Sequence, residues 1–350
     1  MKLKEIAAAA GVSQASISIV RKGNPGVSRE TRIRIQQLLR ENGFSYAEYD
    51  RRHQQKQSPP AFENATQYVR LIKFKRHAML VDGNEGFVSS IIEALDHESR
   101  KHNYHLIIST VTPDAFPSFL ADISKDAIAS VIVIATEMEQ SDVDQLAVLP
   151  FPIVLIDSEF VYSPYCCVTM NNQEIAYQAV SYLHRLGHRS IGYLMSKVDT
   201  GNFDRRTAGF LEALKHLGLP LNKRMCFSVG PTMNKAHNDM VQLLKQGAPM
   251  PTAFFAANDT IAIGCMKAIR QHGYRIPDDI SIIGVDNIPF AEISEPPLTT
   301  IGVSCASIGR TVISVLLHII RSDEPTPRTK TLISGELIVR QSTAAVPMQD

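Results

Sequence analysis

The stretch GVSQASISIVRKGNPGVS, residues 11–28, decides how the first part of this chain folds. A short helical pattern precedes it, because Leu3, Ile6 and Ala10 recur at intervals of three and four residues. Gly11 ends that helix, since a residue without a Cβ atom readily adopts the left-handed conformation that such an ending needs. The stretch therefore begins with a tight turn between two helices.

A second helix is predicted directly after this turn. Ser13 is a good N-cap, and Ile17 and Val20 fall on one face of the helix that it caps. The Gly-Asn-Pro-Gly cluster at 23–26 then breaks the chain, and Ser28 caps a third helix. This third helix carries the inward-facing Ile35, Leu38 and Leu39 and the basic Arg29, Arg32, Arg34 and Arg40. Such an arrangement is a helix-turn-helix, whose second helix lies in the major groove of DNA.

The exposed residues of the second helix differ in what they can read. Gln14 can pair with the edge of an adenine, whereas Ala15 and Ile19 can contact only a thymine methyl group. The serines and the basic residues suit phosphates or base edges. The candidate DNA contacts in the helices are Ser13, Gln14, Ala15, Ser16, Ser18, Ile19, Arg21, Lys22 and Arg29. A three-helix bundle that binds a protein through a charged face is the alternative interpretation.

Charge is distributed unevenly along the chain. Residues 1–56 hold 11 Lys and Arg and 5 Asp and Glu, a balance of +6, although the whole chain of 350 residues carries only +1. A basic head on a mildly acidic body is typical of a module that meets phosphate, with a basic solvated tail as the alternative. No apolar run is long enough to span a membrane, and Glu5 interrupts the amino-terminal stretch that resembles a secretion signal. The five cysteines show no paired framework, so we expect reduced thiols and a cytoplasmic protein.

Beyond a Ser-Pro-Pro sequence at 58–60, short apolar runs alternate with helical stretches. Most runs are nearly continuous in Val, Ile and Leu, as strands covered on both faces are. The alternation predicts parallel sheets in two lobes, with ligand chemistry at the carboxyl ends of the strands and between the lobes. The predicted strands are 69–74, 105–110, 130–135, 152–157, 166–170, 190–195, 252–256 and 280–286, and the main helices are Val88–His102, Gln173–Leu186, Asp204–Leu217 and Thr260–His272.

The predicted fold is thus α/β with an all-α helix-turn-helix head. The head and a hinge segment span 1–57, a linker spans 58–67, and an effector-binding domain spans 68–350. Lobe 1 is expected at 68–165 and 298–326, and lobe 2 at 166–297 and 327–345.

The body contains no enzyme motif, since a P-loop, a GxGxxG after a strand, HExxH and GxSxG are all missing from the sequence. His97, His102 and His105 straddle a helix end and a strand, so we expect neither a metal site nor a cofactor. Polar residues instead end the predicted strands, and an arginine begins a helix. They are Asp157, Asn171, Asn172, Asn258, Asp259, Asp286, Asn287 and Arg206. Together they suit the hydroxyls of a sugar, although capping or turn chemistry is the alternative for each one alone.

The run KEIAAAAGVSQASISIVRKGNPGVSRETRIRI resembles the headpiece of the lactose-repressor (LacI/GalR) family of bacterial transcription regulators. The body is similar to the family's effector-binding core through IVLID, RRTAGFLEALKHLGL, PTAFFAANDTIAIGCMKAIRQHGYRIPDDISIIGVDN and ELIVRQST. That core is similar to periplasmic sugar-binding proteins. The resemblance implies that Gln14, Ala15 and Ile19 read bases. It also places the effector contacts at Asn84, Phe87, Asp157, Phe160, Phe203, Arg206, Asn258 and Asp286.

The sequence departs from the family pattern at two places. Family members usually carry an arginine where Ile19 stands, so a bidentate contact to guanine, worth about 1–3 kcal/mol, is missing. In the hinge segment 44–57, Tyr46-Ala47 stands for Pro-Asn, Asp50-Arg51 for Ala-Arg, and His53 for the leucine that wedges into the minor groove. Arg51 and Arg52 can still approach phosphate or a narrow minor groove. A polar linker that never becomes helical is the alternative for this segment.

These features predict a ligand-responsive transcription regulator, and a repressor in particular. One helix-turn-helix spans a half-site, so the expected partners are a near-palindromic DNA operator and a second copy of the chain, with a tetramer left open. Helix Ile308–Ile320 and the helix after Phe87 are the candidate dimer contacts. A sugar is the expected effector, and a nucleobase or a phosphorylated metabolite is the alternative. A solute-binding protein is disfavoured because it needs an export signal and has no use for residues 1–57.

Overall fold

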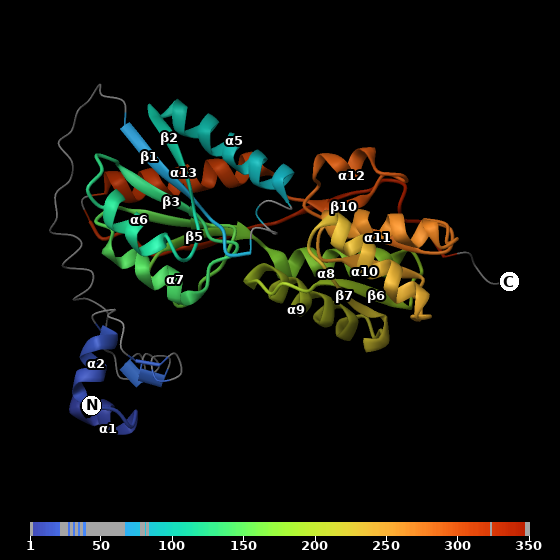
Figure 1. The fold of residues 1–350 in the computed structure, drawn as a ribbon, viewed down its shortest axis with the longest axis horizontal. Helices are drawn as coiled ribbons and strands as arrows, with labels where there is room; N and C mark the ends of the chain where they lie inside the picture. Colours follow the sequence, from blue (N-terminus) through green and yellow to red (C-terminus); the bar gives the residue numbers. More distant parts are fainter. Residues whose placement is uncertain are drawn as a thin grey trace.

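The computed structural model describes residues 3–21, 27, 28, 31, 34, 35, 38, 39, 67–77, 81, 84–322 and 324–346. At the amino terminus, α1 (Leu3–Ala9) and α2 (Gln14–Arg21) are joined by a tight turn at Gly11, whose φ is +67° (Figure 1). Ser13 Oγ accepts a hydrogen bond from the Ser16 amide at 3.2 Å, which confirms the predicted N-cap. Among the described residues of the head, the buried core contains Ile6, Ala7, Ala10, Ile17, Val20, Ile35 and Leu39.

Lobe 1 is a six-stranded parallel sheet of order β11-β5-β4-β3-β1-β2. Its strands are β1 (Gln67–Phe74), β2 (Tyr104–Val111), β3 (Ser130–Ile134), β4 (Ile153–Ile156), β5 (Cys166–Met170) and β11 (Lys330–Ile333). The helices are α5 (Glu85–Lys101) and α13 (Cys305–Arg321) on one face, and α6 (Phe116–Ile123) and α7 (Gln140–Gln145) on the other (Figure 1). Helices cover both faces of the sheet, because successive side chains of β1 point to opposite faces and both faces are apolar. Leu71 lies in the core under α5, and Phe74 lies in the core under α6.

Lobe 2 is a second six-stranded sheet of order β12-β10-β9-β8-β6-β7, in which β12 is antiparallel to β10. Its strands are β6 (Ile191–Ser196), β7 (Cys226–Val229), β8 (Ala253–Ala256), β9 (Ser281–Val285), β10 (Thr299–Gly302) and β12 (Glu336–Ile338). The helices are α8 (Asn172–Arg185), α9 (Gly201–His216), α10 (Met233–Lys245), α11 (Asp259–Gln271) and α12 (Pro289–Ile293). Gly209 brings α9 close to α8, because an added Cβ atom would lie 2.1 Å from the Gln173 carbonyl oxygen.

The predicted division into lobes was wrong at three strands. β5 and β11, assigned from the sequence to lobe 2, pair with each other and with β4 in lobe 1. β10, assigned to lobe 1, pairs with β9 in lobe 2. The chain crosses between the lobes after β5, after β10 and after β11. β5 and β11 therefore belong to the sheet of lobe 1, and β10 belongs to the sheet of lobe 2, because each strand pairs before the chain crosses.

All eight strands predicted from apolar runs are present, and no end differs from the prediction by more than two residues. Four strands were not predicted, because each has only three or four residues and carries polar side chains: β7, β10, β11 and β12. Within the described ranges, no helix is long and apolar enough to cross a membrane.

Candidate functional site

The outer face of α2 carries the residues predicted to read DNA. Gln14 and Ala15 are exposed at the start of the helix, and Ile19 is half-buried one turn later. Ser13 is exposed and caps the helix, and Ser16 and Ser18 are half-buried. The hinge segment 44–57 and the side chain of Arg21 lie outside the described part of the chain, as do Lys22, Arg29, Arg51, Arg52 and His53.

The predicted effector residues meet where the two lobes face each other. Asp157 follows β4 of lobe 1, whereas Asp286 follows β9 of lobe 2. Both have a left-handed backbone, with φ of 57° and 106°, and so does Asn287, with φ of 52°. Only one other described non-glycine residue has a positive φ, so the strained conformations concentrate at this boundary.

Arg206 of α9 holds the centre of this cluster and is only 3% exposed. Its Nε donates to Asn172 Oδ1 at 2.8 Å, and its Nη2 donates to Asp286 Oδ1 at 3.0 Å. Its Nη1 donates to the carbonyl oxygen of Ala257. The ring centre of Phe203 lies 5.8 Å from the guanidinium carbon. The guanidinium is therefore fixed by three different segments of lobe 2.

Two sets of hydrogen bonds join the lobes. Asn84, which precedes α5 of lobe 1, donates from Nδ2 to Asp286 Oδ2 at 2.7 Å. Asn202 of α9 donates from Nδ2 to the carbonyl oxygen of Asp157 at 2.9 Å and to its Oδ1 at 3.2 Å. Asn202 Oδ1 in turn accepts from Asn172 at 3.1 Å. Because Asn172 also accepts from Arg206, the bridge to Asp157 is coupled to the position of the guanidinium.

Burial changes the acidity of the carboxyl groups in the cluster. Burial raises the pKa of Asp157 to about 6, although a hydrogen bond of 2.5 Å from Thr136 Oγ1 favours its ionised form. Burial also raises the pKa of Asp286 above its ordinary value, against the opposing effect of Arg206. The neighbouring Asp259 is fully buried, and its pKa is raised well above the usual range by burial and by Asp286.

The remaining predicted effector residues are placed differently. Phe87 is buried in the core of lobe 1, and Phe160 packs against the second core of that lobe. Asn258 caps α11, with Oδ1 accepting from the Ile261 amide at 2.9 Å. The structure therefore brings together Asn84, Asp157, Phe203, Arg206 and Asp286, while it uses Phe87 for packing and Asn258 for capping.

Three residues of this region were not predicted as site residues: Asn202, Thr136 and Glu137. Asn202 lies four residues before Arg206 on α9, so helical spacing could have placed the two on one face. Glu137 is 4% exposed and accepts from the amides of Arg76 at 2.6 Å and His77 at 2.7 Å. It thereby holds the chain that follows β1 and precedes Asn84. No local sequence pattern predicts this contact, because its partners are about 60 residues apart in the chain.

The cluster offers polar contacts to a ligand but no metal-binding arrangement. Among the described side chains, no group of three or more His, Cys, Asp or Glu could hold a metal ion. Carboxylates, amides and one guanidinium that converge between two lobes can bind a small polar molecule and link its position to lobe closure.

Comparisons with known proteins agree with both halves of the chain. Residues 2–45 match the model of bacterial regulatory proteins of the lacI family, and residues 180–343 match that of the periplasmic binding protein-like domain. The chain is 28% identical over 344 residues to the HTH-type transcriptional repressor PurR of Mannheimia succiniciproducens, covering 97% of this chain and 98% of the relative.

Solved structures share the fold over nearly the whole length. The CelR–cellobiose complex has a TM-score of 0.72 at 20% identity, covering 98% of this chain and 99% of CelR. The lac repressor dimer bound to operator and the anti-inducer ONPF has a TM-score of 0.69 at 21% identity, covering 99% of both chains. This chain therefore carries a DNA-binding domain of the lacI family at residues 2–45 and is similar over nearly its whole length to transcriptional repressors, so it is a DNA-binding transcriptional regulator and not an enzyme.

Proposed function

We propose that this protein is a repressor whose affinity for a near-palindromic operator is controlled by a small molecule bound between its two lobes. The observation that carries the proposal is the pair of hydrogen-bonded links between the lobes, Asn84 to Asp286 and Asn202 to Asp157. A ligand held by the same groups changes the free energy of lobe closure by its differential affinity for the two states. The segment 44–60 would transmit this change to the heads.

A sugar is the effector class that these groups fit. Asp157 and Asp286 offer carboxylate oxygens from opposite lobes, and adjacent hydroxyls of a sugar can donate to both. The half-buried ring of Phe203, beside Arg206, offers an apolar surface for one face of the sugar. Cellobiose in the CelR complex is a sugar bound by a protein of the same fold.

The operator is expected to differ from that of family members with an arginine at the position of Ile19. Gln14, which is exposed at the start of α2, can read an adenine, and Ile19 can contact a thymine methyl group. A regulator of chromosomal genes acts where the DNA is, so we place this protein in the cytoplasm.

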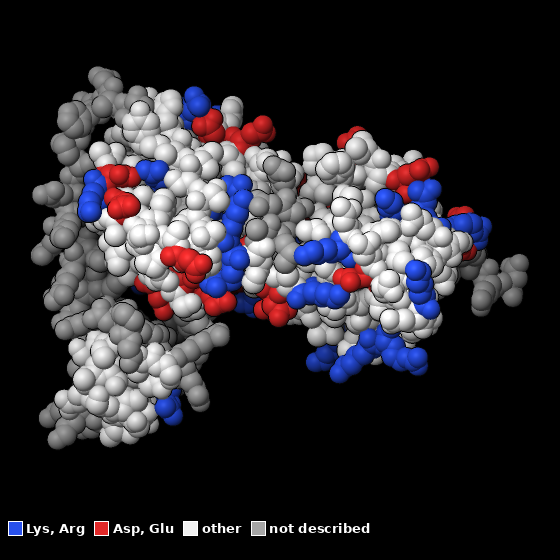
Figure 2. All heavy atoms as spheres, in the orientation of Figure 1, with Lys and Arg blue, Asp and Glu red and all other residues white. Residues whose placement is uncertain are grey.

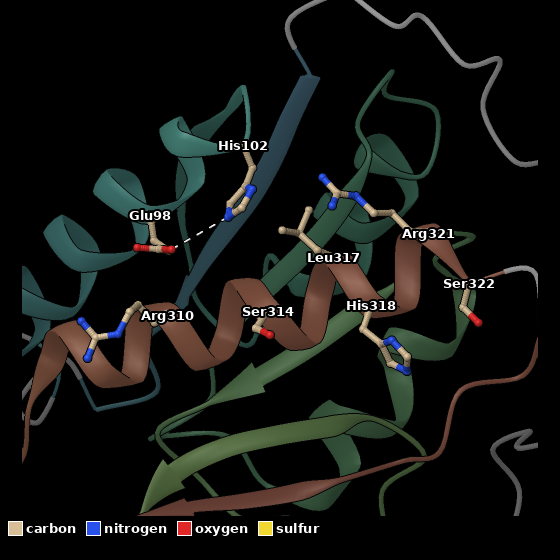
Figure 3. Close-up of a pocket in the computed structure, with 8 residues that line it drawn as sticks. All are labelled: Glu98, His102, Arg310, Ser314, Leu317, His318, Arg321 and Ser322. Carbon is tan, nitrogen blue, oxygen red and sulfur yellow. Dashed lines mark ion pairs between the residues drawn. The ribbon is translucent and has the colours of Figure 1, made fainter.

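We propose a homodimer through α5 and α13 of lobe 1, as two heads are needed for a palindromic site. The apolar side chains for which α13 was predicted as a dimer contact pack inside lobe 1 instead, because Ile308, Val312 and Leu316 are buried there. The outward face is polar instead, and a surface cavity of about 660 Å³ lies along it (Figure 3). Arg310 on α13 and the exposed Glu93 on α5 can pair across a twofold axis.

The experiment that tests this function is selection of double-stranded fragments from a random pool by the full chain. We expect enrichment of near-palindromic sites, and an affinity that falls linearly with salt on logarithmic axes as counterions are released. Analytical ultracentrifugation of the bound complex should show two chains on each selected site. Failure to retain any fragment in a salt-dependent manner would contradict the proposal.

A further inference from the structure

Arg206, the one guanidinium at the centre of the described cluster, has few N–H groups left to donate to a ligand. Of its five N–H groups, Nε donates to Asn172, Nη1 donates to Ala257, and Nη2 donates to both Asp286 and the Met170 sulfur. Its charge is balanced by the Asp286 carboxylate at 3.0 Å. A phosphate needs several free donors and net positive charge, so this arginine is a poor anchor for an anionic effector.

The hydrogen-bond acceptors of the cluster retain far more capacity. Each oxygen of Asp157 and of Asp286 accepts one hydrogen bond from a side chain, and a carboxylate oxygen has room for about two. The Oδ1 atom of Asn84 is buried and has no hydrogen-bond partner at all. A ligand that satisfies these groups must therefore be rich in donors.

The balance of charge leads to the same conclusion. Two carboxyl groups, Asp157 and Asp286, are linked by hydrogen bonds to a cluster that contains one guanidinium, so negative charge exceeds positive charge when both are ionised. Basic side chains also flank the boundary between the lobes on the face drawn in Figure 2, so it matters whether their charges are already balanced by acidic partners.

Two arginines near this boundary are already engaged with acidic partners. Arg76, just after β1, pairs with Asp142 at 2.5 Å, and Arg205, next to Arg206, pairs with Glu159 at 3.4 Å. Their charge is largely balanced before any ligand enters.

We propose that the effector is a polyhydroxylated molecule that carries an amino group, an amino sugar, and that the site between the lobes rejects phosphorylated sugars. The ammonium group donates to Asp157 and to the unpartnered Oδ1 of Asn84, while hydroxyl groups donate to Asp286. This inference rests on the proposed function, because it names the ligand of the same site between the lobes.

The test measures the melting temperature of the full chain with matched sugars at one millimolar concentration. Each set contains a plain sugar, its 2-amino form and a phosphate: glucose, glucosamine and glucose 6-phosphate, then the galactose and mannose counterparts. Stabilisation by a ligand rises with the ratio of its concentration to its Kd, so the shifts rank the affinities. We expect an amino sugar to give the largest shift, with affinity about tenfold above its plain counterpart, and the phosphates to give none.

A larger shift with any plain or phosphorylated sugar would overturn the inference and leave the proposed function standing. The absence of a shift with every member would also overturn it, and selection of DNA by the same protein decides separately whether the proposed function holds.

Two further measurements link the preference to the named carboxylate. Asp157→Asn should remove most of the advantage of the amino form, whereas the exposed Asp114→Asn should leave it intact. In the unmodified chain, binding of the amino sugar should weaken as the pH falls through about 6, where Asp157 takes up a proton. A preference that persists in Asp157→Asn and at low pH would contradict the assignment.

Discussion

The face of α2 and the cluster around Arg206 recognise their ligands through different kinds of groups. On α2, Gln14 and Ala15 are exposed and the helix is held from its other side by Ile17 and Val20. In the cluster, Asn172, Asn202, Arg206 and Asp286 are buried, and their side chains are joined by hydrogen bonds. Substitutions of the exposed side chains of α2 should therefore change DNA recognition without changing stability, whereas substitutions in the cluster should change both stability and ligand response.

The largest effect is expected for Arg206→Ala. It leaves the buried Asp286 without its charged partner at 3.0 Å, so the free energy of unfolding should fall by about 3–5 kcal/mol and the effector response should vanish. Urea denaturation and effector-dependent operator binding measure the two effects. The matched control is Arg205→Ala, which removes a more exposed ion pair with Glu159 and should change stability by less than about 1 kcal/mol. Equal losses in the two variants would remove the contrast between buried and exposed groups.

Asp157 should give the next effect, through pH. Its folded pKa of about 6 lies above the ordinary 3.8, so the folded state binds the proton more tightly than the unfolded state. The resulting stabilisation is full below about pH 4 and is lost as the pH rises through about 6, a change of about 3 kcal/mol. Urea denaturation across this range should show a component that Asp157→Asn lacks. The same pH dependence in both proteins would show that Asp157 ionises normally.

Gln14→Ala should reduce affinity for the selected operator by about 1–3 kcal/mol, because a bidentate contact to adenine is lost. Affinity for unrelated DNA and the melting temperature should stay unchanged, since the side chain is exposed. Fluorescence anisotropy with both DNA fragments checks this prediction. An equal loss on both fragments would mean that Gln14 contacts the backbone and reads no base.

The smallest effect is expected for Ser13→Ala, which removes the acceptor of the Ser16 amide at 3.2 Å. The start of α2 should lose about 1 kcal/mol of local stability. Hydrogen exchange at the Ser16 amide should become faster, while exchange in lobe 2 should not change. Unchanged exchange at Ser16 would show that the cap contributes nothing.

The two regions also differ in how far the sequence predicts them. The turn at Gly11, the cap at Ser13 and the burial of Ile17 follow from neighbours within a few residues, so local patterns suffice. Asp157 and Asp286 could be named as well, because each directly follows the carboxyl end of a parallel strand, where sheets of this kind bind their ligands.

Contacts between segments far apart in the chain could not be predicted in this way. Asn202 lies in an amphipathic helix, where a polar residue is normally solvated, and its partner Asp157 is 45 residues away. The assignment of β5 and β11 to lobe 1 depends on where the chain crosses between the sheets, and periodicity contains no information about that. Neither effect changes the strand and helix pattern, so the fold class was predicted while the lobe boundaries were not.

The most direct test of the account is whether ligand binding at the Arg206 cluster changes DNA affinity. Fluorescence anisotropy of the selected operator would be measured with and without the most strongly stabilising sugar, in the unmodified chain and in Arg206→Ala. We expect a change of about 5–150-fold in the unmodified chain, corresponding to a coupling of about 1–3 kcal/mol, and none in the variant. An operator affinity that the bound sugar leaves unchanged in the unmodified chain would contradict it.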